Sequence, residues 1–309
     1  MIYYPVIIPT LCRYEHFKRC VESLARCTHA EYTELIIGLD YPLKECHWNG
    51  YRLLCEYIPT IKGFKRVLCF KREHNYGAIA NGDDLVEYVF KCNDAVILSE
   101  DDNEFSPCFL DYMNKALEMY KNEERIVSIS GYTHREFEGI AKSDVLFTYD
   151  NNAWGIGIWR DKELNNEVTY QYYMELWKSS RAFFSLIATS PSIAYMFSTM
   201  IIKKQKWGDV MRTVKNINEN KFQVRPYHSL VRNYGNDGSG LHSGVDDRFL
   251  KQEILNEDFF QLKNSRISNS IPQNKMFYFQ SAHNKLKLWG RIIKCIGCYC
   301  RYRLTLNNV

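Results

Sequence analysis

The fold of this chain is best read from Ala95-Val-Ile-Leu-Ser-Glu-Asp-Asp-Asn-Glu104, in which an apolar run breaks abruptly into three adjacent carboxylates. A short continuous apolar run is typical of a buried parallel strand, and open α/β sheets hold ligands at the carboxyl ends of such strands. Acids this close repel one another unless a cation or a water-filled site relieves them. Hard carboxylate oxygens suit Mg²⁺ or Mn²⁺, which commonly bridge carboxylates to phosphate oxygens. We therefore expect Glu100, Asp101 and Asp102 to form a metal site for a phosphorylated substrate, or else a solvated turn before a helix.

Strands and helices alternate on both sides of this stretch. Short apolar runs predict strands, and apolar residues at helical spacing predict helices between them. Ser106 and Pro107 are typical of an N-cap and a first helical residue, so we expect the acids to lie on a strand-to-helix loop. Such alternation favours an α/β fold with a mostly parallel sheet flanked by helices. The pattern predicts strands over 6–9, 35–40, 66–70 and 127–131, and helices over 17–24, 78–90 and 107–120.

The second half of the chain has a less regular pattern. Residues 152–160 read as a glycine-bent aromatic loop or strand, and 164–202 as helical. No linker rich in Pro, Gly or Ser divides the chain, so we expect one domain over 1–280. The final segment, 281–309, has six lysines and arginines and no acid, interleaved with apolar side chains. We expect this basic tail to lie as an amphipathic helix on an anionic membrane surface, or to bind a partner or a second copy.

Composition bounds the class of protein. The chain has 309 residues, of which 46% are hydrophobic and 25% charged, enough for one large globular core. The net charge of +4 and the lack of a nucleic-acid module argue against nucleic-acid binding. An odd count of 11 scattered cysteines indicates a reducing compartment, and neither a signal peptide nor an apolar run of membrane-spanning length is recognisable. We therefore expect a cytoplasmic protein.

Polar side chains at three further places are candidates for chemistry. Arg13 and Asp40 follow the first two predicted strands, where they can bind a base and a ribose, or act as a surface ion pair or helix cap. Asp209 stands two residues after Trp207, and an apolar neighbour raises the pKa of a carboxylate toward the range of a general base. The segment 233–244 has four glycines, whose backbone amides can close over a diphosphate, although it lacks the spacing of a Walker loop.

These blocks, in this order, resemble the GT-A glycosyltransferases, which use nucleotide-sugar donors, and are most similar to the N-acetylglucosaminyltransferase I type. Cys12-Arg-Tyr14 is similar to the base-recognition turn of that family, and Gly38-Leu-Asp40 to its second nucleoside contact. The run 100–107 is similar to its EDDLE-type metal motif, and Trp207-Gly-Asp-Val-Met-Arg212 resembles its W-D-D-W-M-R segment. The resemblance covers 6–244 and implies the GT-A fold, a Rossmann-like mixed sheet.

The chain departs from this pattern in several places. Gly208 replaces the first Asp of the tryptophan motif, Val210 replaces its second Trp, and no membrane anchor precedes the catalytic blocks. These departures speak against a mannose acceptor on an N-glycan. We expect instead a similarity to bacterial enzymes that extend capsule, lipopolysaccharide or other surface glycans at the inner face of the cytoplasmic membrane.

The resemblance implies an inverting, metal-dependent transfer of a hexosyl or N-acetylhexosaminyl group from a UDP-linked donor to a hydroxyl of a saccharide or lipid-linked acceptor. It implies a nucleotide-binding half over about 1–125 and an acceptor-binding half over 126–280. Asp102 would contact Mn²⁺ or Mg²⁺, Asp209 would be the catalytic base, and Trp159 would stack on a sugar or pack in the core. The implied donor-binding residues are Pro9, Thr10, Arg13, Asp40, Asn75, Gly77, Asn81, Glu100, Asp101 and His242, and the implied acceptor-binding residues are Trp154, Gly155, Asp237 and Ser239.

Three other functions remain open from the sequence. A sugar nucleotidyltransferase shares a nucleotide-binding sheet and an acidic metal site, but its glycine-rich triphosphate loop has no counterpart in Pro9-Thr-Leu-Cys-Arg13. A retaining transferase uses the same fold, because the stereochemical outcome depends on where Asp209 lies relative to the sugar. A non-catalytic scaffold of a polysaccharide-synthesis complex would not need the acids at 100–102 and 209.

Overall fold

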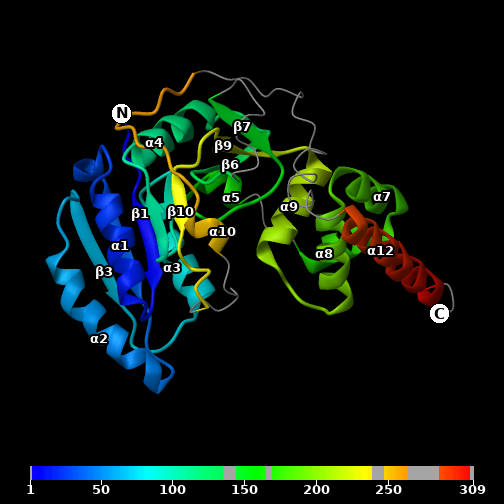
Figure 1. Ribbon diagram of the computed structural model, residues 1–309, viewed down its shortest axis with the longest axis horizontal. Coiled ribbons are helices and arrows are strands. Elements are labelled where there is room, and N and C mark those ends of the chain that lie inside the picture. The colour runs from blue at the N-terminus through cyan, green and yellow to red at the C-terminus, as the bar shows by residue number, and fades with distance from the viewer. Residues whose placement is uncertain (1, 135–143, 165–168, 239–246, 264–284, 307–309) are drawn as a thin grey trace.

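The computed structural model divides into a sheet-centred part and a cluster of helices beside it (Figure 1). It describes residues 2–134, 144–164, 169–238, 247–263 and 285–306. The strands of the central sheet are β1 (Val6–Thr10), β2 (Glu34–Leu39), β3 (Arg66–Lys71), β4 (Ala95–Leu98), β6 (Ile126–Ser130), β7 (Val145–Thr148), β8 (Ile156–Trp159) and β9 (Phe222–Pro226). Their order across the sheet is β3-β2-β1-β4-β8-β6-β9-β7. Because only β7 and β8 run against the others, the sheet is mixed and mostly parallel, as the alternating pattern predicts.

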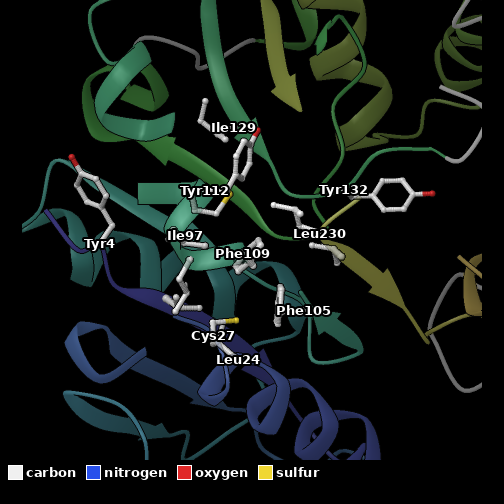
Figure 2. Packing of buried hydrophobic residues seen from close by; sticks show 14 of the residues in the cluster. Tyr4, Leu24, Cys27, Ile97, Phe105, Phe109, Tyr112, Ile129, Tyr132 and Leu230 are labelled. Carbon is white, nitrogen blue, oxygen red and sulfur yellow. The ribbon is translucent and has the colours of Figure 1, made fainter. Parts of the chain in front are cut away.

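Helices cover both faces of this sheet. Successive side chains of a strand point to opposite faces. Ile7 and Val96 meet Leu85 of α3 on one face, whereas Ile97 packs on the other face with Phe109 of α4 (Figure 2). The helices of this part are α1 (Tyr14–Ala25), α2 (Trp48–Tyr57), α3 (Ala78–Phe90), α4 (Phe109–Tyr120), α5 (Arg160–Leu164) and α10 (Asp247–Leu250).

One predicted boundary in this part is wrong. The helix after the acids begins at Phe109, and Ser106 does not cap it, because its hydroxyl donates to the carbonyl of Leu255. Between the acids and this helix lies a short strand, β5 (Asn103–Phe105), which pairs antiparallel with β10 (Val231–Asn233). The acids therefore lie on a turn between β4 and β5, and β5 pairs with a segment that is distant in the sequence.

The region predicted to be helical forms α6 (Tyr170–Lys178), α7 (Ser180–Thr189) and α8 (Pro191–Ile202), followed by α9 (Gly208–Glu219). The C-terminal segment forms α12 (Lys285–Leu306), which packs against these helices (Figure 1). Their shared core contains Trp177, Phe183, Phe197, Val210 and Tyr299. Within the described residues, no helix combines the length and apolarity needed to cross a bilayer.

Candidate functional site

The carboxyl ends of β1 and β4 bring the acids beside the start of α1. The two strands are parallel neighbours, with Val6 opposite Ile97, so the turns that follow them meet at one edge of the sheet. Thr10, the last residue of β1, donates from Oγ1 to Oδ2 of Asp101 at 2.8 Å. Asp101 and Asp102 are each only 6% exposed, so their charges need partners inside the protein.

A cation of the chain itself lies among these acids. Arg13, the residue just before α1, contacts Asp101 and places Nη2 2.8 Å from Oδ2 of Asp102. We call Glu100, Asp101 and Asp102 the acidic cluster. Arg13 supplies part of the positive charge that the sequence pattern assigned to a metal. The sequence interpretation, which gave Arg13 to a nucleotide base, missed this pairing.

The acidic cluster carries more negative charge than Arg13 neutralises. Burial raises the pKa of Asp101, Arg13 opposes this rise, and Asp102 adds to it. The pKa of Glu100 is raised to about 8 because the surrounding protein desolvates its carboxylate and because the negative charges of Asp102, Asp101 and Asp209 repel it. The Glu100 side chain nevertheless keeps contact with solvent. Glu100 is therefore the member of the acidic cluster that is most open to a ligand.

The start of the glycine-rich segment closes over Asp102. Asn233 donates from Nδ2 to Oδ1 of Asp102 at 2.6 Å, and the N–H of Tyr234 donates to the Asp102 carbonyl at 2.8 Å. A Cβ on Gly235 would lie 2.1 Å from Oδ2 of Asp102, so only glycine fits there. The position of Asn233 at the head of that segment was the only sequence signal for its contact with the acid.

Asp40 follows β2, and its carboxylate accepts hydrogen bonds from a neighbouring loop and from the next residue. Its Oδ1 accepts from the N–H groups of Tyr41 at 2.9 Å and Tyr76 at 2.8 Å. Its Oδ2 accepts from the N–H of Gly77 at 2.9 Å and Nδ2 of Asn75 at 3.1 Å. A carboxylate has about four acceptor sites. Asp40 and Asn75 therefore shape the loop before α3, and the nucleoside contact expected of them stays a prediction.

Asn81 and Pro9 also serve the scaffold beneath this loop. Asn81 is fully buried, donates from Nδ2 to the Gly38 carbonyl at 2.8 Å and accepts from Nε of Arg72 at 2.9 Å. Pro9 lies opposite Gly38 in the sheet. The described contacts of both residues are with the protein, so the predicted donor contact stays a prediction for them.

Asp209 lies in the first turn of α9. Its charge contributes to the raised pKa of Glu100, although the two residues are far apart in the sequence. Loss of water raises the pKa of Asp209 itself, while the amide of Asn151 and the charge of Arg212 oppose this rise. Asn151 donates from Nδ2 to Oδ1 of Asp209 at 3.3 Å. The side chain remains exposed, which is the arrangement that a general base needs.

A buried network that the sequence interpretation did not identify holds the segment around Asn151. Arg225 has no solvent exposure and donates from Nη2 to Oδ2 of Asp150 at 2.6 Å. Gln223, also fully buried, accepts from the N–H of Asn152 at 3.2 Å. The N–H of Asn151 in turn donates to Oγ1 of Thr213 in α9 at 3.0 Å. This network joins the start of α9, and so Asp209, to the sheet.

The glycine and tryptophans near β8 have packing roles. A Cβ on Gly155, where φ is +65°, would lie 2.9 Å from the ring of Phe109, so packing alone demands this glycine. Trp159 is buried and donates from Nε1 to the Leu117 carbonyl at 3.2 Å, which places it in the core rather than at a sugar. Trp154 is half-buried, with its ring edge-on to that of Tyr132 at 4.6 Å between centroids. Of the three, only Trp154 retains a surface for a sugar.

The remaining predicted residues, Asp237, Ser239 and His242, lie in the glycine-rich segment. Asp237 accepts from or pairs with His16 of α1, with 2.9 Å between Oδ2 and Nε2. This contact joins the segment to the same helix end that carries Arg13. Ser239 and His242 lie outside the described residues.

The acidic cluster offers a divalent cation part of a site. Among the described residues, no three His, Cys, Asp or Glu side chains converge as a complete metal cage. Both carboxylate oxygens of Asp102 contact donors, from Asn233 and Arg13, whereas Glu100 is exposed and bears the repulsion of its neighbours. Surplus negative charge on hard oxygens fits Mg²⁺ or Mn²⁺ that takes further ligands from phosphate and water. The residues therefore fit a metal that binds together with a phosphorylated ligand.

No protein-family model and no curated protein sequence matches this chain. Among solved structures, it is similar to the mannosyltransferase PcManGT from Pyrobaculum calidifontis in complex with GDP-Man and Mn²⁺, with a TM-score of 0.41 and 9% identity over 70% of this chain and 68% of that chain. It is similar to residues 1–349 of TarS from S. aureus, with a TM-score of 0.36 and 11% identity over 70% and 71% of the two chains. For mouse xyloside xylosyltransferase 1 the TM-score is 0.34 and the identity 10%, over 57% and 75%. At these scores the likenesses assign no family to the chain.

Proposed function

We propose that the protein is a glycosyltransferase of the GT-A type that moves a hexosyl or N-acetylhexosaminyl group from a UDP-linked donor to a hydroxyl of a saccharide or lipid-linked acceptor. The observation that carries this proposal is that the acidic cluster follows β4 at the carboxyl edge of the sheet and that the charge of Asp209, in the first turn of α9, still acts on Glu100 of that cluster. One site thus contains an under-neutralised acidic cluster for a phosphorylated ligand and a separate exposed carboxylate with a raised pKa.

The donor diphosphate would lie between the acidic cluster, Arg13 and the segment at Asn233. Asp102 and Glu100 would hold a divalent metal, which would supply positive charge to the departing diphosphate. Arg13 adds a second positive charge at the same edge. Preorganised positive charge at a leaving group is usually the largest contribution to such a reaction.

Asp209 would act as general base in a direct displacement. As the acceptor oxygen bonds to the anomeric carbon, its proton passes to Asp209, and the bond from that carbon to the diphosphate oxygen breaks with inversion. The amide of Asn151 binds one oxygen of Asp209 and leaves the other for the acceptor. Trp154 would offer its exposed ring surface to the acceptor sugar.

A role in bacterial surface-polysaccharide synthesis in the cytoplasm belongs to the same proposal. It is supported by the sequence resemblance and by the scattered free cysteines typical of a reducing compartment. The sugar and the acceptor glycan are to be found by screening, since they depend on a few hydroxyl contacts.

The decisive experiment is calorimetric titration of UDP, GDP and CMP into the protein, with and without Mn²⁺. We expect Mn²⁺-dependent binding of UDP that is lost in Asp102→Ala. Asp94→Asn is the matched control, because Asp94 is an exposed acid at the opposite end of β4. Absence of binding by every nucleotide would overturn the proposal in favour of a scaffold. Pyrophosphate release from UTP and a sugar phosphate would instead identify a nucleotidyltransferase.

Asp209→Asn tests the catalytic base. We expect UDP release from UDP-sugars in the presence of an acceptor to fall by about 10²-fold, because proton removal is lost. UDP affinity should stay unchanged, since Asp209 does not belong to the acidic cluster. Full activity of Asp209→Asn would remove it from the mechanism and reopen a retaining reaction.

A further inference from the structure

The C-terminal helix α12 has a buried inner face that fixes its orientation. Cys295 and Tyr299 are both buried in the helical cluster. The Sγ of Cys295 lies 2.9 Å from Oγ of Ser198 in α8, and the ring of Tyr299 stacks on that of Phe183 in α7 at 4.1 Å between centroids. These contacts fix the rotation of α12 about its axis, and so they determine which of its residues face away from the helical cluster.

The outer face of α12 exposes large apolar side chains. Trp289 is 63% exposed and Ile293 is 69% exposed. Their spacing of four residues places them on one face of the helix, one turn apart. Cys300 is also exposed and continues the same face two turns beyond Ile293. An exposed tryptophan beside an exposed isoleucine is costly in water unless the face has a partner.

Positive charge borders this apolar stripe. Lys294 and Arg301 are exposed on one side of it, and Arg303 is exposed on the other. Among the described residues, Lys294 and Arg301 form no ion pair with an acid. The segment 281–309 contains no Asp or Glu at all. The face therefore combines apolar side chains with positive charge that nothing in the described chain neutralises.

We propose that the outer face of α12, centred on Trp289 and Ile293, docks on an anionic lipid surface. Tryptophan is favoured at the boundary between headgroups and hydrocarbon, and each lysine or arginine near an anionic leaflet adds attraction. A helix whose apolar stripe lies between basic side chains lies in the membrane plane, with the stripe buried and the charges at the headgroups. This docking is independent of the chemistry at the acidic cluster.

The test is co-sedimentation of the full chain with vesicles of phosphatidylcholine alone or mixed with phosphatidylglycerol. We expect binding to the mixed vesicles, weak binding to the neutral ones, and release at high salt, because salt screens the charges. Trp289 should report binding as a blue shift in fluorescence that is lost in Trp289→Ser.

Three variants separate the apolar and the charged contributions. Trp289→Ser with Ile293→Ser should lower the partition constant by about tenfold or more. Lys294→Glu changes the charge by two and should lower it by about 30-fold. Ile79→Ser is the matched control, since Ile79 is an exposed isoleucine in α3, and it should bind as the unaltered protein does.

The outcomes decide the proposal. Equal binding by all variants, or no binding to anionic vesicles, would overturn it. A dimer in solution that dissociates in Trp289→Ser, without vesicle binding, would assign the face to a second copy instead. UDP titration of the same variants should be unchanged, so that failure of docking and failure of the proposed catalytic function are read separately.

Discussion

Asp40 and the acidic cluster occupy equivalent places in the fold, since both follow parallel strands at the same edge of the sheet. They differ in how their charge is satisfied. Three donors from the loop at 75–77 and the N–H of the adjacent Tyr41 bind Asp40. In the acidic cluster, Asp101 and Asp102 share the guanidinium of Arg13, and the pKa values of Glu100 and Asp101 are raised.

Asp40 is an acid whose acceptor sites are filled by the protein, whereas the acids of the cluster have charge that is only partly balanced. A saturated carboxylate stabilises the folded state, because each of its hydrogen bonds exists only there. A crowded and under-neutralised cluster costs stability and persists where binding or catalysis needs it. The acceptors of Asp40 are thus filled by the protein, whereas the acidic cluster keeps charge for the ligand that we propose.

Removal of Arg13, the cation that Asp101 and Asp102 share, should have the largest effect on the free energy of unfolding. Arg13→Met leaves Asp101 and Asp102 buried without a counter-charge, which should cost about 3 kcal/mol in the free energy of unfolding at neutral pH. Urea unfolding with and without Mn²⁺ measures this loss. Mn²⁺ should restore more stability to the variant than to the unaltered protein, because it replaces the missing charge. Equal stability of the two proteins would show that Arg13 does not hold the cluster together.

Asp102→Asn should separate activity from stability. We expect turnover to fall by about 10²-fold, because the charge that faces the diphosphate site is lost. The free energy of unfolding should change by less than about 1 kcal/mol, since loss of one carboxylate relieves repulsion in the acidic cluster. Donor turnover and urea unfolding of the same preparation give both numbers. A stability loss with activity intact would reverse the assignment.

Asp40→Asn should show the opposite behaviour. An amide nitrogen cannot accept from the N–H groups that Asp40 binds, so two of its four part-buried donors lose their partner at a cost of about 2 kcal/mol in the free energy of unfolding. UDP affinity per folded molecule should fall far less than in Asp102→Ala. If Asp40→Asn folds normally and fails to bind UDP, Asp40 is a nucleoside contact after all.

Glu100→Gln should produce the smallest effect, visible in the pH dependence of stability. The folded protein binds the Glu100 proton more tightly than the unfolded chain does, because its pKa is raised from 4.5 to about 8. Stability should therefore fall as the pH rises through this range. The slope is modest since solvent screens the exposed side chain. Thermal midpoints from pH 5 to about 9 should vary less in Glu100→Gln than in the unaltered protein; identical curves would contradict the raised pKa.

The strands and helices of the first half follow from the sequence because their signals are local. The helix predicted over 78–90 has those same bounds in the structure. The sequence could not show that Asn103–Phe105 forms a strand, because its partner Val231–Asn233 is remote in the chain. Because Asn103–Phe105 forms a strand, the helix begins at Phe109 and not at the expected Pro107.

The site was predicted in part for the same reason. The acidic cluster and Asp209 are conspicuous in the sequence, and in the fold the charge of Asp209 acts on Glu100. The sequence pattern could not assign Gly155 to packing, because Phe109 contacts it only in the fold. Nor could it pair Arg13 with Asp101, since only the parallel alignment of β1 and β4 brings them together.

The short ladder between β5 and β10 makes Asn233, Tyr234 and Asp102, at the start of the glycine-rich segment, one mechanical unit. Tyr234 is joined by its main chain to the carbonyl of Asp102, one residue before the ladder begins. A displacement of this segment is therefore transmitted to the acid through the backbone, independent of side-chain rotamers. A spectroscopic label at the half-buried Arg232 would sense the position of that carboxylate without touching it.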